Sequence, residues 1–204
     1  MPTLPTPDDS QFTPVPQGNH IAVCYRVIDL GTQRGEYMGK ENFRHKLLIS
    51  WEIPDEKMQD GRPFTIGQRF TWSTSEKATL RSMLESWRGK AFTEADFGPG
   101  GFDIQKVIGV GCMLNVVHAN KNGKVYANIA SVAKLPKAMT APEPTNRCTF
   151  VWLSKEEFIK ANFDGLSDGL KAVIQGSPEY KELSEPEHIV SNGHHELDDE
   201  VPGF

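Results

Sequence analysis

A chain of 204 residues, 38% hydrophobic and 24% charged, has the composition of a folded globular protein and is too short for two full-sized enzyme domains. No apolar run is long enough to cross a bilayer, and the Pro-rich, polar residues 1–19 lack the basic and apolar regions of a signal peptide. We therefore expect one folded core in a cytoplasmic protein, preceded by a flexible arm over residues 1–19.

The net charge of −5 hides two oppositely charged parts. Residues 21–139 contain 17 Lys or Arg and 12 Asp or Glu, whereas residues 140–204 contain 5 and 13. The body is therefore basic and the C-terminal part acidic. An anionic partner of the body is compatible with this distribution, although the net charge alone argues against one.

Three strands are predicted in the first half of the body. Apolar residues alternate over residues 21–28, 43–53 and 64–72. In the second strand, one face carries Trp51 with other apolar residues, and the opposite face carries Arg44 and Lys46. Such strands have one buried face and one partly basic face.

The hydrophobic period then changes from two to 3.6, which predicts a helix. Its apolar stripe is formed by Leu80, Met83, Leu84 and Trp87. Ser73 and Glu76 have the spacing of a capping box at the start, and Gly89 is a typical C-terminal stop.

Two further strands are predicted over residues 112–119 and 125–135, joined by a tight turn at Asn122-Gly123. Five strands with one helix between the third and the fourth is the order of the OB fold, a partly open barrel that binds oligonucleotides and oligosaccharides. We therefore expect a mainly β protein with an OB-fold barrel over residues 20–139.

The C-terminal part differs from the body in composition. Residues 140–184 begin as a Pro-containing linker and continue with helix-capping serines, which predict a small helical appendage. Residues 185–204 are too polar to bury an apolar core, so we expect a disordered acidic tail.

A single strand of nucleic acid is bound without sequence preference when cations follow its phosphates and aromatic rings stack on its bases. The basic candidates are Arg26, Arg44, Lys46, Arg69, Lys77, Arg88 and Lys124, and the aromatic candidates are Tyr25, Trp51, Trp72 and Tyr126. Core packing is the alternative for all four rings; it is favoured for Trp51 and expected for Phe43, because these two share a face with Leu47 and Ile49. A solvated charged face is the alternative for the basic residues.

The body resembles phage-encoded OB-fold single-stranded DNA-binding proteins. The segments that carry the resemblance are AVCYRVIDLGTQ (22–33), KLLISWEI (46–53), FTWSTSEKATLRSMLESWRGKAFT (70–93) and VYANIASVAKLPK (125–137). The resemblance implies nonspecific binding and protection of single-stranded DNA during replication or recombination, in the cytoplasm of a host cell. DNA or RNA as ligand, and self-association, stay open.

The last seven residues resemble the acidic tip of bacterial-type single-stranded DNA-binding proteins. The tip is formed by Asp198, Asp199, Glu200, Val201, Pro202 and Phe204, with Gly203 as a departure from the family's pattern. A basic and hydrophobic pocket can capture such an end. The resemblance implies that the tail recruits replication or recombination proteins, and an ordinary solubilising end is the alternative.

Catalysis is not expected, and neither is a cofactor or a bound metal. The chain has no phosphate-binding loop, nucleophile elbow or HExxH motif, and His194 and His195 fall in the predicted tail. The three cysteines, Cys24, Cys112 and Cys148, are far apart and are expected as buried thiols. The alternative function is a non-catalytic OB-fold protein that binds or inhibits another protein.

Overall fold

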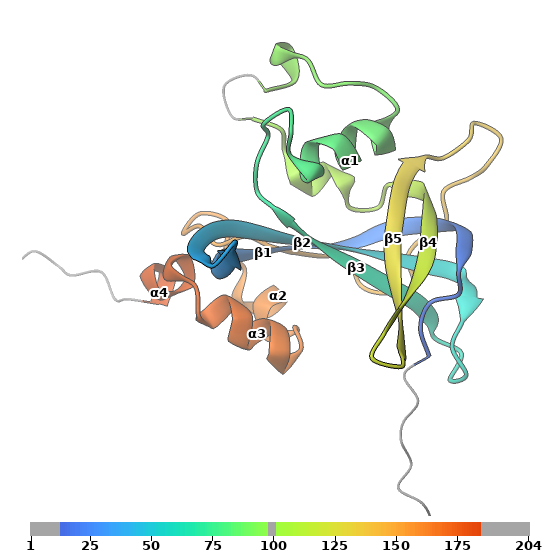
Figure 1. Ribbon diagram of the computed structural model, residues 1–204. Helices are drawn as coiled ribbons and strands as arrows, with labels where there is room; N and C mark the ends of the chain where they lie inside the picture. Colours follow the sequence, from blue (N-terminus) through green and yellow to red (C-terminus); the bar gives the residue numbers. More distant parts are fainter. Residues whose placement is uncertain (1–12, 98–100, 185–204) are drawn as a thin grey trace, which may run out of the picture.

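The computed structural model describes residues 13–97 and 101–184 and is built on an antiparallel sheet (Figure 1). The sheet consists of β1 (Gly18–Tyr37), β2 (Lys40–Lys57), β3 (Pro63–Thr71), β4 (Gly111–Lys121) and β5 (Lys124–Lys134). Their spatial order is β3-β2-β1-β4-β5, and the short β6 (Thr149–Val151) pairs parallel with β1. The prediction of a mainly β protein is confirmed.

Helices lie on both sides of the central strands (Figure 1). On one side are α1 (Thr79–Arg88) and two 3-10 turns, η1 (Glu94–Phe97) and η2 (Ile104–Val107). On the other side are α2 (Lys160–Asp164), α3 (Asp168–Gln175) and α4 (Pro178–Ser184). None of the helices in the described part of the chain is long and apolar enough to span a membrane.

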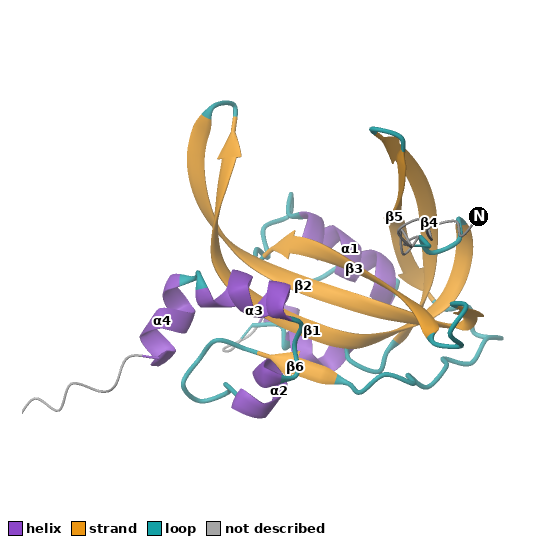
Figure 2. Cartoon of the chain, turned by 90° about the horizontal axis from the view of Figure 1, so that it is seen from below, coloured by secondary structure: helices purple, strands orange, loops and turns teal. Residues whose placement is uncertain are grey.

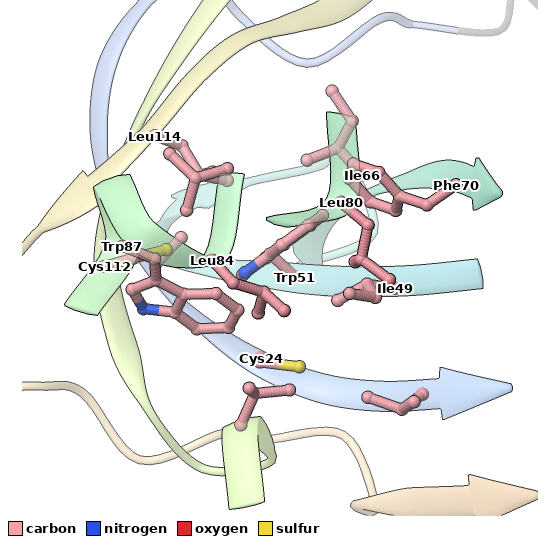
Figure 3. Packing of buried hydrophobic residues seen from close by; sticks show 14 of the residues in the cluster. Cys24, Ile49, Trp51, Ile66, Phe70, Leu80, Leu84, Trp87, Cys112 and Leu114 are labelled. Atoms are coloured by element: carbon pink, nitrogen blue, oxygen red, sulfur yellow. The ribbon is translucent and has the colours of Figure 1, made fainter. Parts of the chain in front are cut away.

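The main core lies between the sheet and α1. Leu47, Ile49 and Trp51 alternate along β2 and are fully buried. Leu84 and Trp87 of α1 lie beside Ile49 and Trp51 (Figure 3). The rings of Trp51 and Trp87 lie 5.6 Å apart between centroids at a tilt of 54°. Aromatic pairs at this separation and tilt add to the stabilisation that burial provides.

A second hydrophobic cluster covers the opposite face of β1 and β2. Ile28, Leu30 and Leu48 of the sheet pack there against residues of the C-terminal part, including Phe163 and Ile174. The helical character predicted for residues 140–184 is present, and these residues also supply β6 to the sheet. The C-terminal part therefore completes the burial of β1.

Two β-hairpins extend beyond the covered part of the sheet, and both project to the same side of the molecule (Figure 2). The β4–β5 hairpin turns at Asn122 and Gly123, whose φ angles of 54° and 75° confirm the predicted tight turn. The β1–β2 hairpin turns in the same way at Met38 and Gly39, with φ angles of 52° and 71°. This second hairpin was not predicted.

The predicted start of the first helix is wrong. The helix begins at Thr79, and its N-cap residue Ala78 has no capping side chain. The Ser73 hydroxyl is hydrogen-bonded to Ser75 instead. The predicted end is confirmed, because Gly89 adopts a left-handed conformation with a φ of 69° and donates its N–H to carbonyl groups of the last turn.

Two expectations about burial are also wrong. Phe43 is 66% exposed because the β1–β2 hairpin carries it past the edge of the core, although it shares a face with core residues. Cys148 is exposed, whereas Cys24 and Cys112 are buried as expected. Burial raises the pKa of the Cys24 thiol to about 12, which keeps it protonated and unreactive at neutral pH.

We expect Ile174→Ala to lower the free energy of unfolding of the whole described unit by about 2–5 kcal/mol, because Ile174 is fully buried in the second cluster. Urea unfolding followed by tryptophan fluorescence and by circular dichroism measures this loss. The matched control is Ile159→Ala at a position that is 54% exposed, where the change should stay within about 0.5 kcal/mol. Two separate unfolding transitions would show that the C-terminal part folds independently.

Candidate nucleic-acid interface

Four of the predicted basic residues line one groove on the outer side of β2 and β3. Arg44 and Lys46 come from β2, Arg69 from β3 and Lys77 from the segment that leads into α1. The groove has a volume of about 490 Å³, and no acidic side chain is among the described residues that line it. We call it the basic groove. It concentrates positive charge from three segments of the chain.

The alternation of the strands places these cations on one face. Leu47 and Phe70 point into the core, so their neighbours Lys46 and Thr71, which oppose each other across the β2–β3 ladder, point outward. The Lys46 ammonium donates a 2.8 Å hydrogen bond to the Thr71 hydroxyl. Hydroxyl groups of the loop after β3 complete the lining, so neutral donors lie beside the cations.

The cations of the basic groove are not neutralised by neighbouring acids. Within the described parts of the chain, Arg44, Lys46, Arg69 and Lys77 take part in no ion pair. Arg34 differs, because it is paired with Glu41 on the same hairpin. The four groove cations are therefore available to an anionic ligand.

The β1–β2 hairpin extends the same face with an aromatic ring. Tyr37 opposes Lys40 and Gln33 opposes Arg44 in the ladder, so the alternation puts Tyr37 and Lys40 on the face of Arg44. Tyr37 is 69% exposed. Neither residue was predicted from the sequence, because Gly31, Gly35 and Gly39 are typical of a loop. The signal that could have found them is the Tyr-Met-Gly-Lys turn.

The β4–β5 hairpin carries the predicted residues Lys124 and Tyr126. Both are exposed, and Tyr126 is 47% exposed. They do not line the basic groove, but their hairpin projects to the same side as the β1–β2 hairpin, with β3 between the two (Figure 2). An extended ligand in the basic groove would lie between the two hairpins.

Two predicted aromatic residues are buried and cannot stack on a base in this structure. Trp51 is fully buried in the main core, so the alternative reading of this residue is correct. Tyr25 is the extra residue of an irregularity in the β1–β2 register, is 7% exposed and packs beneath the guanidinium of Arg26. The prediction for Tyr25 is wrong because a bulge changes the face of the sheet to which a residue points.

Three other predicted residues have partners within the fold. Arg88 donates a 3.0 Å hydrogen bond to Asp96 and lies over the ring of Phe92, away from the basic groove. Trp72 contacts Trp152 edge-on at 5.1 Å between centroids and is only partly exposed. Arg26 covers Tyr25, and its Nε atom is buried without a partner in the described structure. Each of these side chains thus has a contact within the fold, and none of them lines the basic groove.

A buried carboxylate of β1 ties three segments together. Asp29 is 1% exposed and accepts hydrogen bonds from His45 Nε2 at 2.6 Å, from the Gly31 N–H at 2.7 Å and from the Leu153 N–H at 3.3 Å. His45 Nδ1 lies 3.5 Å from Glu179 Oε1 of α4. His45 is thus placed between two carboxylates.

The contacts around His45 shift the pKa values of two groups, His45 and Glu179. The hydrogen bond to Asp29 raises the pKa of His45 above its usual value of 6.5, and the nearby carboxylates act in the same direction. Burial works to raise the pKa of Glu179, but hydrogen bonds from the Thr32 hydroxyl and N–H, together with His45, hold it below its usual value. The result is an ionic contact that fixes α4 to β1 and β2.

Neither a protein-family model nor a curated protein matches this chain. The described residues also contain no cluster of His, Cys, Asp or Glu able to hold a metal ion. The predicted partner-binding tip, from Asp198 to Phe204, lies outside the described residues. Geometry and charge therefore carry the functional interpretation.

We expect the free energy of unfolding to fall as pH rises above 6.5. Because the folded-state pKa of His45 is raised, its protonated ring stabilises the fold fully below pH 6.5, and this contribution is lost as pH rises through the raised pKa. The loss should be about 1.5–3 kcal/mol at most, the scale of one hydrogen bond to a charged group. Urea titrations between pH 6 and pH 9 measure it.

The control for this pH effect uses two variants. His45→Gln should remove the decline with pH, whereas His118→Gln should keep it, since His118 is hydrogen-bonded to the Val15 carbonyl at 2.7 Å and pairs with no acid among the described residues. Glu179 does not interfere, because a carboxyl group with a lowered pKa titrates below pH 4.5. An equal decline in His45→Gln and in the original protein would contradict the assignment.

Proposed function

We propose that this protein binds single-stranded DNA without sequence preference and protects it during replication or recombination. The observation that carries the proposal is the basic groove, which brings together Arg44, Lys46, Arg69 and Lys77 with no acid among the described lining residues. Cations spaced along a groove can follow successive phosphates. Tyr37 and Tyr126 on the two hairpins offer rings for stacking on bases.

We further propose that the sheet is an OB-fold barrel left open between β3 and β5. The spatial order β3-β2-β1-β4-β5 is the order of a five-stranded barrel cut at one junction, and α1 follows β3 in the chain. The basic groove then lies on the β2–β3 face, between the first and the last hairpin, which is where OB folds bind oligonucleotides. The proposed fold and the proposed ligand thus support each other.

The exposed rings of Tyr37 and Tyr126 favour a single strand over a duplex as the ligand. A duplex hides its base faces, whereas a single strand offers a face to each ring, with about 1–3 kcal/mol per stacked base. No catalytic step is assigned to the protein. The expected activity is binding, with occupancy that depends strongly on salt.

The first test is a salt titration of the affinity for a labelled dT oligonucleotide, measured by fluorescence anisotropy. Arg69→Ala should weaken binding and reduce the slope of log K against log salt by about 0.7, because each lost phosphate contact of a single strand releases that much less counterion. The control, Lys160→Ala, removes a cation of α2 that is paired with Asp164 and should leave the slope unchanged. No binding at low salt by the unmodified protein would reject the proposal.

We propose that the acidic tail recruits partner proteins and competes with DNA for the basic groove. Residues 186–204 contain five acidic and no basic residues and end in Phe204. Because the tail belongs to the same chain as the basic groove, its effective concentration at the groove is high without any intermolecular encounter. The tail would then restrain binding until DNA or a partner displaces it.

A version that ends at Glu185 should bind dT more tightly than the full chain at low salt, and the difference should vanish at high salt because screening weakens the competition. A full-length variant with Asp198→Asn, Asp199→Asn and Glu200→Gln separates charge from length. It should reproduce part of the gain. Equal low-salt affinities of the truncated and full-length proteins would contradict the competition.

A further inference from the structure

A second groove lies beside the basic groove, between the two edge strands of the sheet. Gln68 and Phe70 of β3 line one side, residues 129–132 of β5 line the other, and Ser82 and Met83 of α1 lie between them. Its volume is about 220 Å³. We call it the β3–β5 groove. It marks the place where the sheet does not close.

The order of the strands explains why this groove exists. β3 and β5 are the two ends of the path β3-β2-β1-β4-β5, and no ladder joins them within the described residues. Each strand therefore presents an edge with backbone donors and acceptors that no neighbouring strand occupies. Helix α1 packs close to β5, since a Cβ atom on Gly89 would lie 2.9 Å from Lys134 Cδ.

The lining of the β3–β5 groove is chemically neutral and mixed. The polar groups are the amide of Gln68 and the hydroxyls of Thr79, Ser82, Ser86 and Ser131, and no charged side chain is among the described lining residues. Phe70, Met83, Ile129 and Val132 add apolar surface. An uncharged ring with donors and acceptors around its edge matches such a lining, whereas a phosphate does not.

The volume agrees with one nucleobase. An apolar protein cavity of about 150 Å³ holds benzene. A groove of about 220 Å³ thus has room for a pyrimidine, which is a six-membered ring with small substituents. Proteins that hold a base outside a stack combine hydrogen bonds to its edge with apolar contacts to its faces, and both are present here.

The two grooves adjoin each other, because Gln68, Phe70 and Thr79 line both of them. A strand whose phosphates lie along the basic groove would pass the mouth of the β3–β5 groove. We propose that the β3–β5 groove takes one base of this strand while the basic groove holds its phosphates. This inference rests on the proposed function and adds to it a base-binding site on the open edge of the sheet.

The test compares a dT oligonucleotide with an abasic oligonucleotide of the same length, each measured by anisotropy against the full chain. Ser82→Trp fills the groove from α1 with a large side chain. It should weaken binding of dT about tenfold and change binding of the abasic oligonucleotide by less than twofold. Ser184→Trp, at an exposed position of α4, is the control and should change neither affinity.

Equal losses for both oligonucleotides, or no loss for either, would overturn the base site while leaving the proposed function intact. No binding of dT by the unmodified chain would reject the proposed function itself. Photo-crosslinking of the unmodified protein with a dT oligonucleotide containing 5-iododeoxyuridine keeps the test valid if Ser82→Trp does not fold. Crosslinks should map to Met83, the partly exposed α1 residue of the groove, and crosslinks confined to Tyr37 and Tyr126 would contradict the inference.

Discussion

The burial of β1 on both faces is the constraint on which the rest of this structure depends. Ala22, Cys24 and Val27 contribute to the main core under α1, whereas Ile28 and Leu30 belong to the second cluster under α2–α4. A strand that is apolar on both faces must be covered on both. Residues 140–184 provide the second cover, and the cations of the basic groove lie on β2, on the edge strand β3 and on the segment that leads into α1.

Two buried carboxylates hold this second cover in place. Glu52 is fully buried and accepts hydrogen bonds of 2.8 Å from the N–H groups of Thr145 and Asn146, just before β6. Asp29 accepts the N–H of Leu153, just after β6. Burial works to raise the pKa of Glu52, but the hydrogen bonds from Asn146 and Thr145 outweigh it and leave the pKa lowered. Each buried acid therefore has the donors that its desolvation requires.

Local periodicity predicted the elements but not their extent. The alternation over residues 43–53, the helical stripe around Leu84 and the Asn122-Gly123 turn each have a local cause, and the structure contains all three. The end of the β1–β2 hairpin was not predicted, because it is exposed and consists largely of glycines and charged residues. Its sequence therefore lacks the alternation of buried and exposed residues that indicates a strand. Phe43 has the parity of core residues but lies where no helix covers the sheet.

The four cations of the basic groove were predicted one by one, but their meeting in one groove was not. Nothing local to Lys77 indicates that it lies beside Arg44, because a loop and the β2–β3 ladder bring them together. Trp51 and Tyr25 were candidates for base stacking, but both are buried. An aromatic side chain can stack on a base or pack in a core, and only burial decides between the two. The β3–β5 groove depends on an unpaired edge, which is a property of the whole sheet.

The contact of Glu179 with Thr32 and His45 has a mechanical consequence. The β1–β2 hairpin leaves the sheet near the irregularity between Asp29 and Gly31, and α4 holds the chain at that point. A Cβ atom on Gly31 would lie 2.5 Å from Ser177, just before α4, and 2.7 Å from Glu179 Oε2, so the start of α4 and the strand are in direct contact there. The base of the hairpin is thus held by α4, the last described element of the chain. Displacing α4 would therefore break the Glu179 contacts at the base of the hairpin that carries Tyr37.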